Sequence, residues 1–444
     1  MTTPTATSAI RKTTRRKVLW RLMPFLCLCY LVNYIDRSNI SIAGPSGMNQ
    51  ELGLTATAYG FAAGIFFVGY ILLEVPSNIA LHKFGARVWI ARILISWGAV
   101  ASATAFVPNQ GWLIGLRFLL GVAEAGFTPG ILLYLTYWFV QRDRAQAFAL
   151  FLVGIPLSSV IGAPLASWLI ALGDGWGFSG WRFMILATGV PAILLGLMCF
   201  FYLTDRPDQA KWLSDEERSV LCADLDQEAA GYQSHSIRGV LLNTKVWILC
   251  VVYFCIVYGL YAIGFFLPTI IQGFQAQYAV KYSVVDVGLL TAIPYAFATL
   301  FLIFWSNHSR KHDEVTMHVA ISAVMGAAGI LIAIWANSPT LTLVGVSLAA
   351  MGLCSAIPIS FGVPTKFLTG MAAASGLALI NTFGNIGGFT GPFIFGWIHD
   401  ATGTTTAGMY VIAGLCLIAG ALNAFVIRRW KMTADALTDQ IGHF

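Results

Sequence analysis

Arg117 and Glu124 lie seven residues apart in a strongly apolar stretch of the chain, residues 111–129. On a helix this spacing is about two turns, or roughly 10 Å, so both side chains are on one face. A charge at the middle of a bilayer costs at least ~2.5–3.5 kcal/mol and is kept only beside a partner or a water-filled path. Asp36 and Arg37 form a second such pair in another apolar segment. These residues indicate a pathway for an anion and a proton; the alternative is two ion pairs that only hold helices together.

Arginine suits a buried anion site, because its guanidinium keeps its charge and offers a carboxylate a planar fork. Arg117 is therefore our first choice for a substrate carboxylate. Neighbours on a helix point about 100° apart, so Asp36 and Arg37 should have different partners. Burial favours a protonated carboxyl and a nearby arginine favours the ionised form. We expect Glu124 to pair with Arg117 when ionised and to release it when protonated, which would couple proton and anion movement.

The composition is typical of a protein that crosses a membrane many times. Of its 444 residues, 57% are hydrophobic and only 10% are charged, whereas soluble domains have about 25% charged residues. The net charge of +6 gives no indication of nucleic-acid binding. The eight cysteines lie almost all in apolar segments and lack the spacing of a zinc site, so we expect no disulfide, no metal and no cofactor.

Twelve apolar segments have the length that a bilayer requires, six before and six after one long charged stretch. The predicted fold is an all-α polytopic membrane protein with twelve transmembrane helices in two six-helix bundles. Its expected parts are a cytoplasmic tail at residues 1–17, a bundle at 18–203, a cytoplasmic central loop at 204–243, a bundle at 244–429 and a cytoplasmic tail at 430–444.

Basic residues give the orientation. They gather in both tails and in the even-numbered loops, which contain Lys83 and Arg87, Arg142 and Arg144, and Arg310 and Lys311. Because cytoplasmic loops carry the excess of Lys and Arg, both termini are expected in the cytoplasm. We expect the membrane to be a plasma membrane, namely a bacterial inner membrane.

The fifth and eleventh apolar segments carry Gly and Pro at 154–164 and 384–392. Interrupted helices at matching positions of two halves point to a binding site between repeats, although glycines also allow close helix packing. Both explanations are compatible with the pattern.

The second half has no charged residue in the middle of a span and offers polar side chains instead. Tyr258 and Tyr261 share a helix face, either toward the substrate or in packing. Asn381 and Asn385 are expected to face a cavity, because an unpaired amide is costly in lipid. Glu74 is expected near the cytoplasmic end of its helix, as a pairing residue and not a coupling site.

Several of these stretches resemble the major facilitator superfamily over nearly the whole chain. The greatest resemblance is to its anion:cation symporter family, which includes transporters for phthalate, tartrate, 4-hydroxyphenylacetate, galactonate and glucarate. The stretches that carry it are residues 33–40, 69–78, 117–130, 266–270 and 376–388. The resemblance implies protonation for Asp36 and Glu124, contact with the substrate carboxylate for Arg37 and Arg117, and a polar cavity lining for Tyr70 and Asn381.

Two loop positions depart from the superfamily pattern. The acids that usually help to close the inner gate are replaced by His82 and Arg310. We expect the cytoplasmic gate to involve Gly85, Arg87, Arg142 and Arg144.

The predicted function is a proton-coupled symporter that imports an organic carboxylate by alternating access. Sugar acids, dicarboxylates and aromatic acids need the same carboxylate clamp, and the expected partners are this substrate, protons and the lipid bilayer around a monomer. An exchanger or exporter of organic anions is the alternative. An enzyme is not expected, because no mid-span His lies beside an acid and no metal ligands are suitably spaced. A sensor would need a longer cytoplasmic domain.

Overall fold

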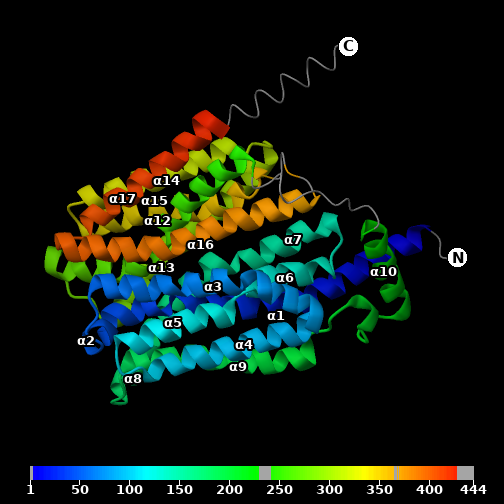
Figure 1. The fold of residues 1–444 in the computed structure, drawn as a ribbon, viewed down its shortest axis with the longest axis horizontal. Coiled ribbons are helices and arrows are strands. Elements are labelled where there is room, and N and C mark those ends of the chain that lie inside the picture. Colours follow the sequence, from blue (N-terminus) through cyan, green and yellow to red (C-terminus); the bar gives the residue numbers. More distant parts are fainter. Residues whose placement is uncertain (1–3, 230–241, 365–367, 369, 428–444) are drawn as a thin grey trace, which may run out of the picture.

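The computed structural model describes residues 4–229, 242–364, 368 and 370–427. These residues form helices and connecting turns without a strand, and the long helices lie side by side in two groups (Figure 1). The tail predicted at 430–444 lies outside the described residues, as do parts of the tail at 1–17 and of the central loop at 204–243. The described part of that loop contains a short 3-10 helix and one α-helix.

The first group is built from the first half of the chain. Its helices are α1 (Pro4–Ala43), η1 (Gly44–Met48), α2 (Asn49–Glu51), α3 (Ala56–Phe84), α4 (Ala86–Ala103), η2 (Thr104–Phe106), α5 (Gln110–Glu124), α6 (Phe127–Thr136), α7 (Gln141–Leu152), α8 (Gly154–Gly175) and α9 (Gly180–Tyr202). The linker helices are η3 (Pro207–Gln209) and α10 (Asp215–Ala229). α1 begins at Pro4, so most of the region expected as an N-terminal tail is the first part of this helix.

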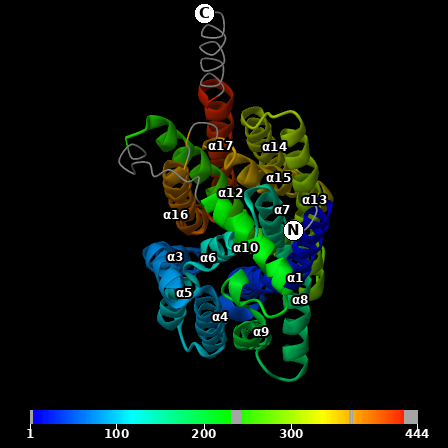
Figure 2. The same ribbon diagram turned by 90° about the vertical axis from the view of Figure 1, so that its right-hand side faces the viewer.

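The second group follows the linker. Its helices are α12 (Thr244–Tyr278), α13 (Val284–Lys311), α14 (Thr316–Trp335), α15 (Pro339–Ser360), α16 (Gly370–Thr402), α17 (Thr406–Ala421) and η5 (Leu422–Ile427). Figure 2 looks along the helices from the end where α1 starts and α10 lies, which we call the linker end. The opposite end, where α2 lies, is the α2 end.

Eleven described helical segments are long and apolar enough to cross a membrane, six in the first half and five in the second. α16 has 33 residues, but its asparagines and glycines make it less apolar than these. With α16 included, the predicted all-α architecture of twelve helices in two bundles is confirmed.

The helix breaks differ from those expected. The fourth span is divided: α5 ends at Glu124, Ala125 is extended, and Gly126 has a left-handed φ of 82° before α6 begins. Glycine adopts this conformation without the steric cost that a Cβ brings. The fifth span is divided only at Val153.

The interruption expected in the eleventh span is wrong, because α16 continues unbroken through residues 384–392. Its glycines serve close packing instead. A Cβ at Gly387 would lie 2.8 Å from the carbonyl oxygen of Phe254, and one at Gly391 would lie 2.6 Å from that of Tyr258. Both carbonyls belong to α12, so small residues here let two helices of the second bundle approach each other.

The two bundles meet along α3 and α16 and along α8 and α13 (Figure 2). Gly60 of α3 faces the carbonyl of Pro392, and Gly396 of α16 faces the carbonyl of Ala56, with no room for a Cβ at either glycine. These tight contacts lie in the part of α3 nearest the α2 end. The bundles are therefore firmly packed together at that end.

Candidate functional site

Arg37 and Glu124 form an ion pair in the interior of the first bundle. Nη2 of Arg37 contacts Oε1 of Glu124, and the two residues are only 6% and 0% exposed. Nη1 of Arg37 donates to the hydroxyl of Tyr261, which comes from α12 of the other bundle, at 3.5 Å. The ion pair thus lies where the two halves of the molecule meet.

Aromatic rings surround the Arg37 guanidinium. Its central carbon lies 4.8 Å from the ring centroids of Tyr34 and Phe66 and 5.5 Å from that of Tyr70. Ring faces attract a cation, and a planar guanidinium stacks on them well. Tyr70, predicted as a cavity residue, is 5% exposed and lies in this group.

Arg117 has a different set of contacts. It is 2% exposed, and its Nε and Nη2 donate to the backbone carbonyls of Ala62 and Ala63 in α3, at 3.3 and 3.5 Å. No carboxylate forms an ion pair with it among the described residues. The pairing expected between Arg117 and Glu124 is therefore wrong for this structure. Glu124 is the last residue of α5, and its carboxylate contacts Arg37 of α1 instead.

Asp36 points away from Arg37. Its Oδ2 accepts a hydrogen bond of 2.9 Å from the indole N–H of Trp97 in α4, while Oδ1 has no partner. The amide of Asn33, one turn earlier on α1, is also buried and unpaired. The expectation that Asp36 and Arg37 have different partners is confirmed.

The polar residues of the second half are only partly brought to the arginines. Tyr261 reaches Arg37, whereas Tyr258 is buried against α16, with its hydroxyl in no described hydrogen bond. Nδ2 of Asn385 is buried without a partner. One turn earlier, Nδ2 of Asn381 donates to Glu74 at 3.2 Å.

That contact changes the interpretation of Glu74. The side chain is partly buried at the junction between α3 and α16, and its described partner belongs to the opposite bundle. Glu74 is thus a pairing residue, and its partner lies across the junction of the two bundles.

The predicted gate residues Gly85 and Arg87 meet the linker. Oδ1 of Asp205 accepts from the backbone N–H of Arg87 at 2.8 Å, and its Oδ2 lies 3.9 Å from Nε of Arg87. Gly85 has a φ of 86°, and a Cβ there would lie 2.9 Å from Asp205. His82, which replaces the usual acid, is 3.0 Å from the hydroxyl of Tyr137. Asp205 thus supplies a carboxylate to this loop from the linker.

Arg142 and Arg144 lie at the start of α7, beside α10. Arg144 pairs with Glu228 of α10 at 3.0 Å, and Arg142 lies 3.8 Å from Asp143. Among the described residues, neither has a hydrogen bond or ion pair with the second bundle. The four predicted gate residues therefore form contacts within the first bundle and its linker.

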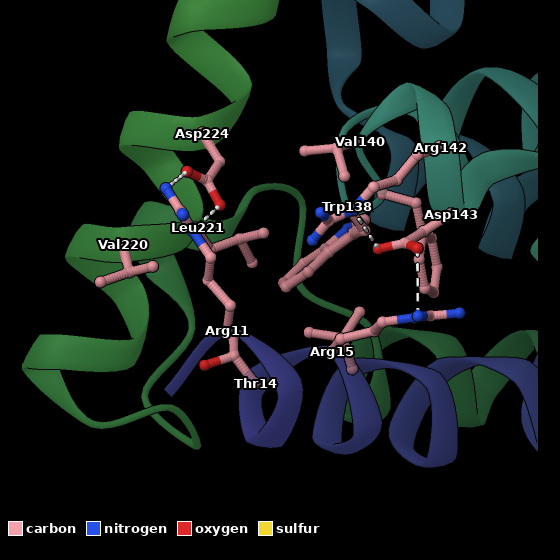
Figure 3. Close-up of a pocket in the computed structure, with 12 residues that line it drawn as sticks. Arg11, Thr14, Arg15, Trp138, Val140, Arg142, Asp143, Val220, Leu221 and Asp224 are labelled. Atoms are coloured by element: carbon pink, nitrogen blue, oxygen red, sulfur yellow. Dashed lines mark hydrogen bonds and ion pairs between the residues drawn. The ribbon is translucent and has the colours of Figure 1, made fainter. Parts of the chain in front are cut away.

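The linker helix is docked on α1 by ion pairs. Figure 3 shows Arg11 of α1 reaching Asp224 of α10, with contacts of 2.6 and 2.9 Å. Lys17 lies 2.6 Å from Glu217. Burial raises the pKa of Glu217, but Lys17 and the contacts with Ser214 together lower it by more. The pKa therefore lies below its ordinary value. The Lys17 pair is therefore fully formed at neutral pH and weakens only as the pH falls through that lowered pKa.

Sequence reasoning missed the aromatic and indole partners of the charged residues. Trp97 is fully buried against Asp36, and Tyr34 and Phe66 flank Arg37. One local signal was present, because Tyr34 and Arg37 are three residues apart and share a helix face. Trp97 and Phe66 come from other helices, and nothing in their own segments distinguished them from core residues.

The chain is similar to known transport proteins over almost its full length. The family model described as Major Facilitator Superfamily matches residues 26–280 and 249–439. A putative tartrate transporter of Agrobacterium vitis is 43% identical over 95% of this chain and 93% of its own length. The putative metabolite transport protein NicT of Pseudomonas putida is 40% identical over 93% of each chain. The structure of the xylose transporter XylE of E. coli, in a partially occluded inward-open conformation, superposes with a TM-score of 0.71 at 12% identity, covering 92% of this chain and 98% of that one.

Proposed function

This chain belongs to the major facilitator superfamily, and from its buried charges we propose that it is a symporter which imports an organic carboxylate together with protons. It is a transporter and not an enzyme. The cargo, the proton coupling and the direction of transport are parts of the proposal.

The main support is the unequal partnering of two buried arginines. Arg37 is neutralised by Glu124, whereas Arg117 is buried against backbone carbonyls with no carboxylate partner among the described residues. A buried guanidinium is stable only where charge-assisted hydrogen bonds compensate its desolvation. A substrate carboxylate bound to Arg117 would supply them.

Proton coupling follows from the Arg37–Glu124 pair. An ionised Glu124 holds Arg37, and protonation of Glu124 removes the charge that holds it. Arg37 would then be free to bind the anion beside Arg117, whose guanidinium lies near the same Phe66 ring. Anion binding and proton binding thus favour each other, as symport requires. Asp36, held by Trp97 on the other side of α1, is the second proposed proton site.

The second bundle would recognise the rest of the substrate. Tyr261 is in contact with Arg37, and the unpaired amide of Asn385 is a free donor for a hydroxyl or a carboxylate. A hydroxy-dicarboxylate of the tartrate type is the first substrate to test, because a relative at 43% identity is named a putative tartrate transporter. Tyr258 contributes as packing support for α16 in this proposal, and Asn381 acts through Glu74.

We also propose that the protein is a monomer in a bacterial inner membrane, with both termini in the cytoplasm. The support for the orientation is the excess of Lys and Arg at the linker end. The outer face would then be the α2 end, where the bundles are packed together.

The test is uptake of labelled tartrate, gluconate and benzoate into proteoliposomes, with and without an inward proton gradient. We expect at least one carboxylate to accumulate only with the gradient. Counterflow at equal pH separates the alternatives. Exchange without gradient-driven accumulation would identify an exchanger, and no movement of any of the three would contradict carboxylate transport.

A further inference from the structure

Glu74 is a charged residue of the membrane-spanning region that has no ion-pair partner in the described structure. It lies inside α3, and its carboxylate accepts only the 3.2 Å hydrogen bond from Asn381 of α16. The other two acids located away from span ends are Asp36, bonded to Trp97, and Glu124, paired with Arg37. Glu74 therefore has a neutral partner, and that partner belongs to the other half of the molecule.

The groups that face Glu74 come from four helices. Arg37 of α1, Tyr70 of α3 and Tyr253 of α12 are the charged or titratable neighbours, and Asn381 of α16 is the neutral one. Tyr70 lies one helical turn before Glu74 and also faces Arg37. Arg37 is thus near enough to act on Glu74 electrostatically but is bonded to Glu124.

The balance of charge around Glu74 favours protonation of an acid that has no described ion-pair partner. The interior of the first bundle and its border with the second hold three carboxyl groups, of Asp36, Glu74 and Glu124, and two guanidinium groups, of Arg37 and Arg117. With all five ionised, the interior has one excess negative charge before any anion enters. An uncompensated charge away from water is expensive, and protonation is the usual way to remove it. Entry of a carboxylate increases the excess.

Asparagine suits a carboxyl group that changes its protonation state. Its NH₂ group donates to a carboxylate, and its carbonyl oxygen accepts from a protonated carboxyl. An arginine can only donate and would hold the carboxyl ionised. Since Asn381 and Glu74 are on opposite bundles, movement of the bundles in alternating access would make and break their contact.

We propose that Glu74 is a third proton carrier of the transport cycle, which takes up a proton as the anion enters and releases it on the other side of the membrane. The proposal rests on the proposed symport and deepens it, because it adds one proton to each cycle. The proton comes from water on the entry side and returns to water on the exit side. When the bundles part at Glu74, loss of Asn381 and contact with water favour release.

The first experiment measures the number of protons carried per substrate. Wild-type protein and Glu74→Gln are reconstituted, and the reversal potential of labelled tartrate uptake is determined at several proton gradients. We expect Glu74→Gln to carry one proton fewer per tartrate. Glu74→Asp keeps the carboxyl and should carry the wild-type number. An unchanged number in Glu74→Gln would overturn the proposal, and a reduced number in Glu74→Asp would point to a packing effect.

The second experiment needs no substrate. Infrared titration of the purified protein follows the stretching band of protonated carboxyl groups as the pH is changed. Glu74→Gln should lose one titrating component of this band. The control Glu216→Gln alters an exposed acid of α10 and should leave the band at neutral pH unchanged. If Glu74→Gln has the wild-type band, Glu74 carries no proton, whatever the transport assay shows. The wild-type protein could move no carboxylate while Glu74→Gln still loses the titrating band. In that case the proposed function fails but Glu74 remains a proton site.

Discussion

The two buried arginines differ in the partners that the fold leaves to them, and this difference separates their roles. Arg37 has an acid, a tyrosine hydroxyl and aromatic rings, whereas Arg117 has two backbone carbonyls. Backbone carbonyls satisfy N–H groups without neutralising the charge. In the proposed mechanism, Arg117 is therefore prepared for an anion, and Arg37 becomes available only when Glu124 is protonated.

Arg117→Lys should weaken carboxylate binding tenfold or more. The lysine keeps the charge but loses the planar fork, and a hydrogen bond to a charged group is worth about 1.5–3 kcal/mol. Binding of the transported carboxylate to the purified protein is the measurement. Lys83→Arg, an exposed change at the linker end, is the control. Wild-type affinity in Arg117→Lys would support a purely structural role for Arg117.

Glu124→Gln should bind the anion yet fail to accumulate it under a proton gradient. The neutral amide resembles the protonated acid, so Arg37 is released permanently and proton transfer is lost. Asp36→Asn should likewise lose accumulation, while counterflow survives in at least one variant. Accumulation is compared with counterflow at equal pH. Gradient-driven accumulation by both variants and by the double variant would exclude these acids as coupling sites.

At the scale of elements, the break between α5 and α6 directly follows Glu124. This residue is the last of α5, and its carboxylate pairs with Arg37 of α1. The break depends on Gly126, whose left-handed backbone turns the chain into α6. The chain thus changes direction directly after the acid of the buried ion pair.

Gly126→Ala should lower the thermal stability of the protein. A Cβ in the left-handed region costs about 1–2 kcal/mol, and here it would also collide with the side chain of Ser77. Gly115→Ala is the matched control, because Gly115 is helical with open space around it. The measurement is the apparent unfolding temperature of each variant in the same detergent. Equal temperatures for the two variants would mean that the α5–α6 break can relax.

A second element-scale feature closes the α2 end. Asp400 of α16 accepts hydrogen bonds from the backbone N–H groups of Ala56 and Thr57, at 3.1 and 2.8 Å, and from the Thr57 hydroxyl at 2.5 Å. A carboxylate at a helix N-terminus satisfies free N–H groups and the helix dipole. Here the acid and the helix belong to different bundles, so the contact must break when this end opens.

Asp400→Asn should shift the molecule toward opening at the α2 end. A loss of about 1–2 kcal/mol changes the ratio of the two conformations about 5- to 30-fold. Distances between spin labels at Gln110 and Thr404, both exposed at this end, can be measured by double electron–electron resonance. Asp400→Asn should show a larger fraction of long distances than the wild-type protein. Asp286→Asn removes an acid that caps a helix within its own bundle and should not alter the distances. An identical distribution in Asp400→Asn would show that packing alone closes this end.

At the scale of the whole molecule, the linker belongs to the first bundle. Ion pairs bring α10 against α1 and α7. They are formed by Arg11, which Figure 3 shows, and by Lys17 and Arg144. Exposed ion pairs contribute little individually, about 0–1 kcal/mol each. Their number and the stacking of Trp138 on Trp212, with ring centroids 5.4 Å apart, keep the helix in place together.

The linker end should face the cytoplasm. Alkaline phosphatase, which is active only outside the cytoplasm, should be inactive when fused after Phe444 and active when inserted at Gly403, in the loop at the α2 end. The physical basis is the excess of Lys and Arg at the linker end. The reverse pattern of activity would show that the orientation is opposite to the one proposed. Equal activity at both sites would contradict the predicted topology, in which an odd number of spans separates them.

The twelve-helix architecture could be predicted from sequence because the bilayer imposes it locally. A span needs a sufficiently long apolar segment, and its backbone must satisfy its own hydrogen bonds, so length and hydropathy specify each helix without its neighbours. The unusual residues Asp36, Arg37, Arg117 and Glu124 stood out for the same reason. A charge in an apolar segment is visible without any knowledge of the fold.

The pairing of those charges was decided by tertiary structure. Same-face spacing favoured Glu124 with Arg117, and both residues lie in α5, but the Glu124 carboxylate pairs with Arg37 of α1. The contact of Glu74 with Asn381 joins residues 307 positions apart, and no local pattern specifies which helices of two bundles meet. Sequence alone thus determined which charged side chains need partners inside the membrane. The packing of the two bundles decided their partners, because partners depend on distances between helices and not on spacing along one helix.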